Sequence, residues 1–297
     1  MHSIKVVFAL AWFTSFGLSA ASGQSILGAQ GGEGEPNRLQ QWLVPSPDPA
    51  APAHAVLFRP NGDGPFPLAL VAHATTQNVL RRAQMPQPEY RALADFLVAR
   101  GFAVLVPERL GHGGTGGKYL EDQGGCDEAD YSRAGRATAD QIIAAMNFLR
   151  RQPFIRPDRT LVVGHSAGGW GALALGDARG VSAIIVFAPG RGGHANDLPS
   201  QLCAPQALLA SAAEFGKASR VPVTWLVAAN DSYFSPSFSR RLAEAFRGSG
   251  GRVDFHELAP YGSEGHWLVE SGNGVKLAAR ALDTVLKGLR TPAAKKP

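Results

Sequence analysis

Three residues of this chain are of the types that together form an activated serine nucleophile: Ser166, Asp231 and His266. Ser166 is the centre of the sequence GHSAG at positions 164–168, which fits the G-x-S-x-G pattern of a nucleophile on a sharp strand-to-helix turn. A serine hydroxyl is a weak nucleophile at neutral pH, so a hydrogen-bonded imidazole has to accept its proton as the oxygen attacks. The pattern therefore predicts covalent acyl transfer at Ser166.

The expected acid and base follow the serine in the chain order Ser, Asp, His, which is one known order of such a triad. Asp231 follows a predicted buried strand at 221–229, and the carboxyl ends of parallel strands meet at one edge of a sheet. His266 lies in the loop after the last predicted strand, 253–258. We predict that His266 is the general base and that Asp231 holds its tautomer. Asp197 and Glu214 are the alternative acids, although neither ends a predicted strand.

The oxyanion that forms during acyl transfer needs hydrogen-bond donors. One expected donor is the backbone N–H of Ala167, the residue after the nucleophile. The second is expected from the loop after the predicted strand 67–73, where its position favours the N–H of Thr75. Loss of one such donor typically lowers the rate by about 10²–10³.

The elements that would position these residues alternate between short apolar strands and amphipathic helices. This alternation indicates an α/β fold with a mainly parallel, doubly wound sheet and helices on both faces. The stretch 190–220 is expected to form a small cap. The predicted strands are 41–44, 55–58, 67–73, 103–107, 160–163, 181–187, 221–229 and 253–258, and the predicted helices are 88–100, 137–151, 235–247 and one after position 168.

Three short sequences resemble those of a known family: GHSAGG at 164–169, Asn230-Asp231 at a strand end and Gly265-His266 in a loop. They are similar to the dienelactone hydrolase branch of the α/β-hydrolases, and prolyl-oligopeptidase-type catalytic domains share them. The resemblance covers roughly residues 54–290 and implies an α/β-hydrolase fold. Dienelactone hydrolase itself uses a Cys nucleophile, whereas this chain has a serine. The resemblance therefore implies a serine esterase or related acyl hydrolase, acting on carboxylic esters or lactones.

Two alternatives to an esterase remain open. A prolyl-oligopeptidase-like peptidase shares the same motifs, although 297 residues leave no room for a large N-terminal propeller domain. A non-catalytic binding protein on a hydrolase scaffold is also compatible, because a fold does not fix a function. The complete Ser-Asp-His order favours an enzyme. The sequence His73-Ala74 supports the binding protein, because relatives generally carry His-Gly there.

The residues around the predicted triad leave the substrate open. Tyr233, Phe234 and Trp267 flank the acid and the base, and they either line an apolar acyl or alcohol site or belong to the core. Arg109 either orients an anionic substrate or pairs with a nearby carboxylate. Nothing in these residue types distinguishes a lactone, a linear ester, a polyester fragment and a short peptide.

The composition is that of a globular enzyme domain, with 45% hydrophobic and 18% charged residues and a net charge of +5. We expect one domain over residues 54–292, because no linker interrupts the pattern. No Arg/Lys run with interleaved aromatics is present, so a nucleic-acid partner is not expected. The Cys and His spacings predict no metal site, and no cofactor is expected. The expected partner is a small-molecule ester, and the oligomeric state is left open.

The N-terminus has the pattern of a secretory signal peptide over residues 1–23: Lys5, an apolar run at 6–18 and small residues at 19–23. The apolar run is shorter than the about 20 residues that span a bilayer, so cleavage is favoured over a membrane anchor. Export to the periplasm or secretion is expected. Residues 24–53 then form a leader and first strand, with 28–36 as a flexible leader, and residues 293–297 form a basic tail.

Two cysteines, Cys126 and Cys203, remain in the predicted exported chain. An even number of cysteines in an oxidising compartment permits a disulfide. Two separate free thiols are the alternative.

Overall fold

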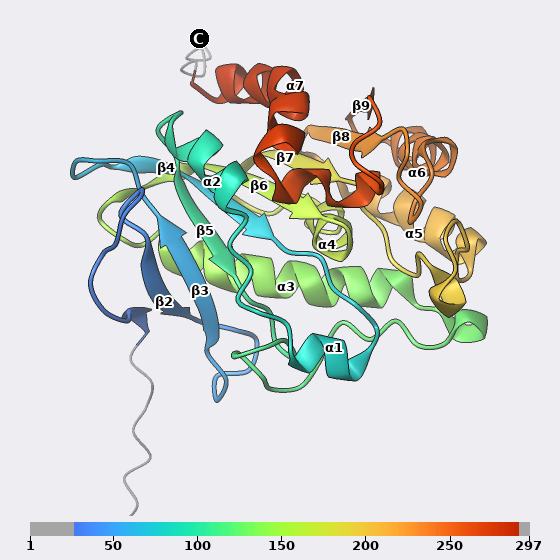
Figure 1. Cartoon of the computed structure of the whole chain (residues 1–297), viewed down its shortest axis with the longest axis horizontal. Coiled ribbons are helices and arrows are strands. Elements are labelled where there is room, and N and C mark those ends of the chain that lie inside the picture. Colours follow the sequence, from blue (N-terminus) through green and yellow to red (C-terminus); the bar gives the residue numbers. More distant parts are fainter. Residues whose placement is uncertain (1–26, 291–297) are drawn as a thin grey trace, which may run out of the picture.

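The computed structural model describes residues 27–290, so the expected signal peptide and basic tail lie outside the described residues. Within this range, nine strands form one sheet in the order β1-β2-β3-β5-β4-β6-β7-β8-β9 (Figure 1). The strands are β1 Gly28–Ala29, β2 Gln40–Val44, β3 Ala53–Phe58, β4 Phe66–Ala72, β5 Ala103–Pro107, β6 Ile155–His165, β7 Val181–Phe187, β8 Val223–Ala228 and β9 Val253–Leu258.

The sheet is antiparallel at one side and parallel over the rest. β1, β2 and β3 pair antiparallel, and β3 pairs antiparallel with β5. All pairings from β5 through β4, β6, β7 and β8 to β9 are parallel. The central strands are runs of buried apolar residues, which is typical of a parallel sheet covered on both faces. The predicted mainly parallel, doubly wound fold is confirmed.

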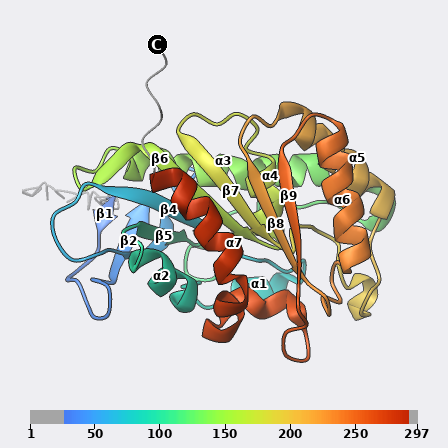
Figure 2. The same cartoon turned by 90° about the horizontal axis from the view of Figure 1, so that it is seen from above.

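Helices cover both faces of this sheet. One apolar core lies between the sheet and α3, α4, α5 and α6, and the other lies between the sheet and α2, η3 and α7. Figures 1 and 2 show α3 and α7 on opposite sides of the sheet. The helices are α1 Val79–Ala83, α2 Arg91–Val98, α3 Tyr131–Leu149, α4 Ala167–Leu173, α5 Pro205–Ala218, α6 Pro236–Gly248 and α7 Gly272–Arg290, with the 3₁₀ turns η1 Cys126–Glu128, η2 Ala195–Asp197 and η3 Gly265–Glu270.

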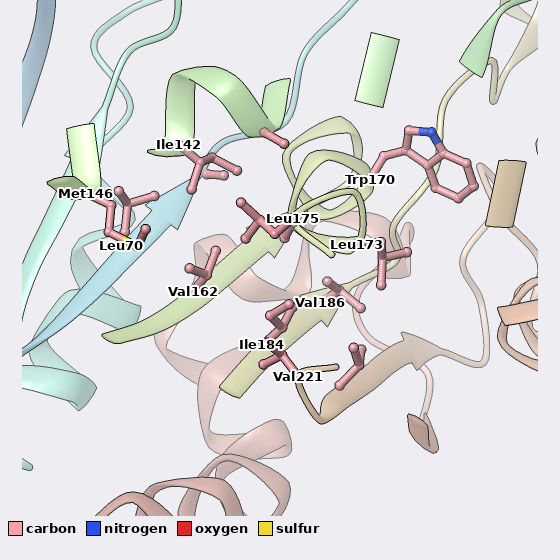
Figure 3. Packing of buried hydrophobic residues seen from close by; sticks show 14 of the residues in the cluster. Leu70, Ile142, Met146, Val162, Trp170, Leu173, Leu175, Ile184, Val186 and Val221 are labelled. Atoms are coloured by element: carbon pink, nitrogen blue, oxygen red, sulfur yellow. The ribbon is translucent and has the colours of Figure 1, made fainter. Parts of the chain in front are cut away.

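The first core fixes α4, the helix that follows the predicted nucleophile. Trp170 and Leu173 of α4 are fully buried, in the same cluster as Val162 of β6 and Val186 of β7 (Figure 3). The Trp170 Nε1–H also donates to the backbone carbonyl of Tyr131 at 2.9 Å. The start of α4 is therefore anchored both to the sheet and to α3.

Two stretches that the sequence indicated as a leader and a cap contain regular structure. The stretch 28–36 is not simply a flexible leader, because β1 pairs with β2 through Gly28 and Leu43. The stretch 190–220, which was expected to form a small cap, contains α5, and α5 buries Leu208 and Phe215 in the same core as α3 and α6. Only the segment ahead of α5 reaches the candidate site described below. None of the described helices is long and apolar enough to cross a membrane.

The two cysteines form a disulfide. Cys126 of η1 is bonded to Cys203, just ahead of α5, with their Cα atoms 5.0 Å apart. The bond joins two segments that are 77 positions apart in sequence. The structure thus has the bonded alternative of the two that the sequence left open.

Candidate active site

Ser166 occupies a strained turn between β6 and α4. Its backbone has φ 54° and ψ −119°, a conformation that a residue with a side chain rarely adopts. The turn is packed so closely that its flanking glycines have no space for a side chain. A Cβ at Gly164 would lie 2.5 Å from Gly169 Cα, and one at Gly168 would lie 2.1 Å from Ala72 O. The glycines of the motif are therefore explained by contact with the turn itself and with the end of β4.

His266 and Asp231 lie in direct contact. His266 Nδ1 is 3.0 Å from Asp231 Oδ2, and both side chains are buried. Asp231 follows β8, and its Oδ1 accepts the backbone N–H groups of Tyr233 at 2.9 Å and Phe234 at 2.7 Å. These bonds leave Oδ2 to accept a hydrogen bond from the His266 Nδ1–H, which selects the tautomer with an unprotonated Nε2.

The alternative acids lie elsewhere. Asp197 is on η2 with an almost fully exposed side chain, 3.9 Å from Arg81. Glu214 is on α5, where it forms an ion pair with Arg136 and accepts from Ser132. Neither is a hydrogen-bond partner of His266 in the described part of the chain.

The loop that carries His266 is fixed by Glu264, which the sequence analysis did not single out. Glu264 Oε1 accepts the backbone N–H groups of His266 and Ser232, each at 3.0 Å, and Oε2 accepts the Ser232 hydroxyl. Burial opposes ionisation of Glu264, but these hydrogen bonds outweigh burial and lower its pKa. A carboxylate two residues ahead of the histidine, at the start of a helical turn, is the sequence signal that was available.

Burial sets the protonation of His266. The pKa of its imidazole is lowered because burial disfavours the charged form, while the hydrogen bond to Asp231 and its charge oppose this effect. The imidazole is therefore neutral at neutral pH. A neutral imidazole whose Nδ1–H is held by a carboxylate can accept a proton at Nε2.

Aromatic rings surround His266. The Tyr233 ring stacks on it with centroids 4.2 Å apart, and Trp267 lies edge-on at 5.1 Å. On the other face of Tyr233, His194 stacks at 3.5 Å, and its Nε2 lies 2.8 Å from the Ser232 hydroxyl. Phe234 is buried and tilted against His266 at 5.8 Å. The sequence placed three of these aromatic residues beside the base, but the stacking order depends on loop conformations that no local pattern predicts.

A cavity of about 600 Å³, here the catalytic cavity, brings the predicted residues together. Asp231 is not part of its lining and reaches it only through His266. The lining includes Ser166, Ala167, Thr75, His266, Tyr233, Phe234 and Trp267, together with both cysteines of the disulfide.

Both expected oxyanion donors border this cavity. Ala167 is the first residue of α4, a position whose N–H has no intrahelical acceptor. Within residues 27–290, the Thr75 N–H also has no protein acceptor. The Thr75 hydroxyl contacts His112 Nε2, and the preceding Ala74 N–H donates to the Tyr90 hydroxyl at 3.1 Å. The loop that carries His73-Ala74 is therefore held from both sides despite its missing glycine.

Arg109 does not line the cavity. It is buried, forms an ion pair with Glu121 and donates to the His73 carbonyl at 2.8 Å. A second buried guanidinium, that of Arg191, pairs with the same carboxylate. Burial raises the pKa of Glu121, but the two guanidinium groups outweigh it and hold the pKa far below its usual range. Of the two alternatives for Arg109, the structure has the ion pair with Glu121. The bond from Arg109 to the His73 carbonyl also holds the start of the loop that carries Thr75.

Comparison with known proteins agrees with this geometry. The model of the prolyl oligopeptidase family matches residues 88–180, a segment that contains the nucleophile turn. No curated protein matches the sequence.

Solved structures resemble the fold at low sequence identity. Acetyl xylan esterase from Paenibacillus sp. R4 is 17% identical with a TM-score of 0.62, covering 90% of each chain. A dienelactone hydrolase homologue from Klebsiella pneumoniae is 15% identical with a TM-score of 0.55, covering 84% of this chain and 98% of that one. A puromycin-hydrolyzing peptidase from Mycobacterium tuberculosis is 16% identical with a TM-score of 0.55, but only 40% of its length is covered. The chain therefore has the α/β-hydrolase fold, which these solved structures share.

Proposed function

We propose that the protein is a serine hydrolase that cleaves carboxylic esters, including lactones, through an acyl-enzyme. The observation that carries this proposal is the buried contact of 3.0 Å between His266 Nδ1 and Asp231 Oδ2, beside a cavity that Ser166 also lines. Acyl transfer needs a base held by an acid and a nucleophile that open onto the same space, and here His266 and Ser166, on its strained turn, line one cavity.

In the proposed mechanism, Ser166 Oγ attacks the ester carbonyl carbon while His266 Nε2 takes the hydroxyl proton. Asp231 accepts the hydrogen bond from the Nδ1–H of His266 and stabilises the imidazolium that forms. The carbonyl oxygen becomes an oxyanion, which the N–H groups of Ala167 and Thr75 stabilise. When the tetrahedral intermediate collapses, His266 returns the proton to the leaving alcohol. Water then attacks the acyl-enzyme by the same steps and releases the acid.

The test is Ser166→Ala, assayed against p-nitrophenyl esters. Alanine fits the space of the serine, so the variant should keep its thermal unfolding midpoint and lose turnover. A fluorophosphonate probe should label the wild type stoichiometrically and leave the variant unlabelled. Undiminished turnover in a correctly folded Ser166→Ala variant would contradict the proposal.

A peptidase is the second candidate, because the matching family model is that of the prolyl oligopeptidases. The two candidates share one chemistry and differ in the leaving group. Parallel kcat/KM values for aryl esters and for peptide anilides separate them. Faster cleavage of the anilides would favour the peptidase. A protein that cleaves neither, and that the phosphonate does not label, would favour a non-catalytic binding protein.

A further inference from the structure

A second cavity, here the side chamber, adjoins the catalytic cavity. Its volume is about 530 Å³, which is within the range of about 300–1,000 Å³ for small-molecule sites. Thr75, Thr76, Arg81 and Trp267 line both cavities. Thr75 carries the proposed oxyanion donor, and the Trp267 ring lies edge-on to His266. The side chamber therefore begins next to the groups that would hold the reacting ester.

The wall of the side chamber is mainly apolar. Met85, Pro86, Pro88, Tyr90 and Trp267 all contribute to it. The polar end of Tyr90 is already engaged, because its hydroxyl lies 2.9 Å from His165 Nδ1 and accepts the Ala74 N–H. What this tyrosine can offer to a ligand is mainly its ring.

The charged side chains among the lining residues of the side chamber are paired or hydrated. Arg91 forms an ion pair with Glu89, and Arg81 lies 3.9 Å from Asp197. The side chain of Glu270 is 46% exposed, so its charge remains in contact with water. The side chamber is thus better suited to a neutral apolar group than to a charged one.

We infer that the side chamber receives a bulky apolar part of the ester substrate while its carbonyl lies at Ser166. This inference rests on the proposed function and adds the substrate class: esters in which one half, the acyl chain or the alcohol, is large and neutral. The two cavities are adjacent, because they share four lining residues, and the inference is that one ester extends from one cavity into the other. Each methylene that enters such a chamber should raise kcat/KM about threefold to fourfold, until the chamber is full.

The test narrows the side chamber at Met85, which is half-buried and outside the proposed catalytic machinery. Met85→Trp reduces its volume, and Met85→Ala removes one apolar contact. Gln84→Trp is the matched control, because Gln84 is the adjacent exposed residue and lines neither cavity. Two substrate series are assayed: p-nitrophenyl esters from acetate to octanoate, and alkyl acetates from ethyl to octyl.

In the wild type, kcat/KM should rise with length in one series, and that series identifies which half enters the chamber. Met85→Trp should lower kcat/KM for the longest member at least tenfold and leave p-nitrophenyl acetate and ethyl acetate within twofold. Met85→Ala should lower kcat/KM for the longest member about twofold to fivefold. Gln84→Trp should leave kcat/KM unchanged for both the short and the long esters. If both Met85 variants changed kcat/KM equally for short and long esters, or did not change it at all, the inference would be overturned. The proposed function would still stand. A wild type inactive toward every ester would contradict the proposed function instead.

Discussion

The phenol ring of Tyr233 lies flat on the imidazole of His266, with ring centroids 4.2 Å apart and an angle of 22° between the ring planes. In the proposed mechanism, His266 becomes positively charged in the transition state. An aromatic face in contact with a cation stabilises it. The stack also restrains rotation of the imidazole, which has to present Nε2 to the nucleophile. Tyr233 is therefore expected to act as a positioning residue for the base.

Tyr233→Ala should lower kcat about fivefold to thirtyfold, which corresponds to about 1–2 kcal/mol of lost cation–aromatic contact. Tyr233→Phe keeps the ring and should retain most of the activity. The measurement is kcat and KM for a short aryl ester in both variants. Equal losses in the two variants would assign the effect to the hydroxyl group and contradict a role for the stack.

Asp231→Asn should lower kcat by several orders of magnitude, because an amide cannot hold the imidazole tautomer or stabilise the imidazolium. His266→Ala should have an effect at least as large. Since the members of a triad act as a unit, the double variant should be scarcely slower than His266→Ala alone. Multiplicative losses, measured as kcat in the single and double variants, would show that the two residues act separately.

The pH dependence follows from the direction of the His266 pKa. Burial lowers this pKa below its ordinary value of 6.5, so the base stays neutral and active in solutions more acidic than that. The acid limb of kcat/KM should therefore have its midpoint below pH 6.5. Because Asp231 raises the His266 pKa, Asp231→Asn should move the limb to still lower pH. If the acid limb of the residual activity of Asp231→Asn moved to higher pH, Asp231 would not be the group that raises the His266 pKa.

Loss of the disulfide should destabilise the fold. In the chain-entropy model, closing a loop of 77 positions lowers the free energy of folding by roughly 4 kcal/mol. The double variant Cys126→Ser/Cys203→Ser should thus unfold at lower denaturant concentration. Reductant should destabilise the wild type and have no effect on the double variant. Two alkylatable thiols in unfolded, unreduced wild type would show that the bond is absent in solution.

Export remains a prediction, since residues 1–23 lie outside the described range. We expect the protein recovered from the periplasm or medium to begin between Ala21 and Gln24. Intact-mass measurement decides this. A recovered chain that still carries residues 1–20 would contradict cleavage.

The sequence predicted those parts of the molecule that depend on local patterns. The bounds of β5, β7 and β9 agree with the predicted strands, because each is a run of strand-forming residues between clear breaks. The start of α3 at Tyr131 was missed, although Asp130 caps it by accepting the Arg133 N–H at 2.8 Å. Gly135, which obscures the helical pattern there, has Phe215 of α5 against it, a contact that the sequence does not show.

In the candidate site, too, local patterns indicate some residues, and others are recognised only in the folded chain. The placement of Ser166, Asp231 and His266 around one cavity follows from a motif and from strand ends that the sequence shows, while their catalytic roles stay a prediction. Arg109 was not, because its partner Glu121 lies in an irregular loop, and only the folded chain brings the two together. Glu264 was missed for a related reason. It acts on the backbone of the His266 loop, and its position as a carboxylate at the start of a short helical turn was the one signal that the sequence offered.

The close packing at Gly168 affects how mutational data on this protein should be interpreted. Any side chain there would displace the carbonyl of Ala72, next to the loop that carries Thr75. In a saturation library selected for turnover, positions 164 and 168 should thus be as intolerant as the nucleophile, although they contribute no chemical group. A parallel selection for abundance would separate the two kinds of position, since Ser166 variants should accumulate normally and Gly168 variants should be depleted.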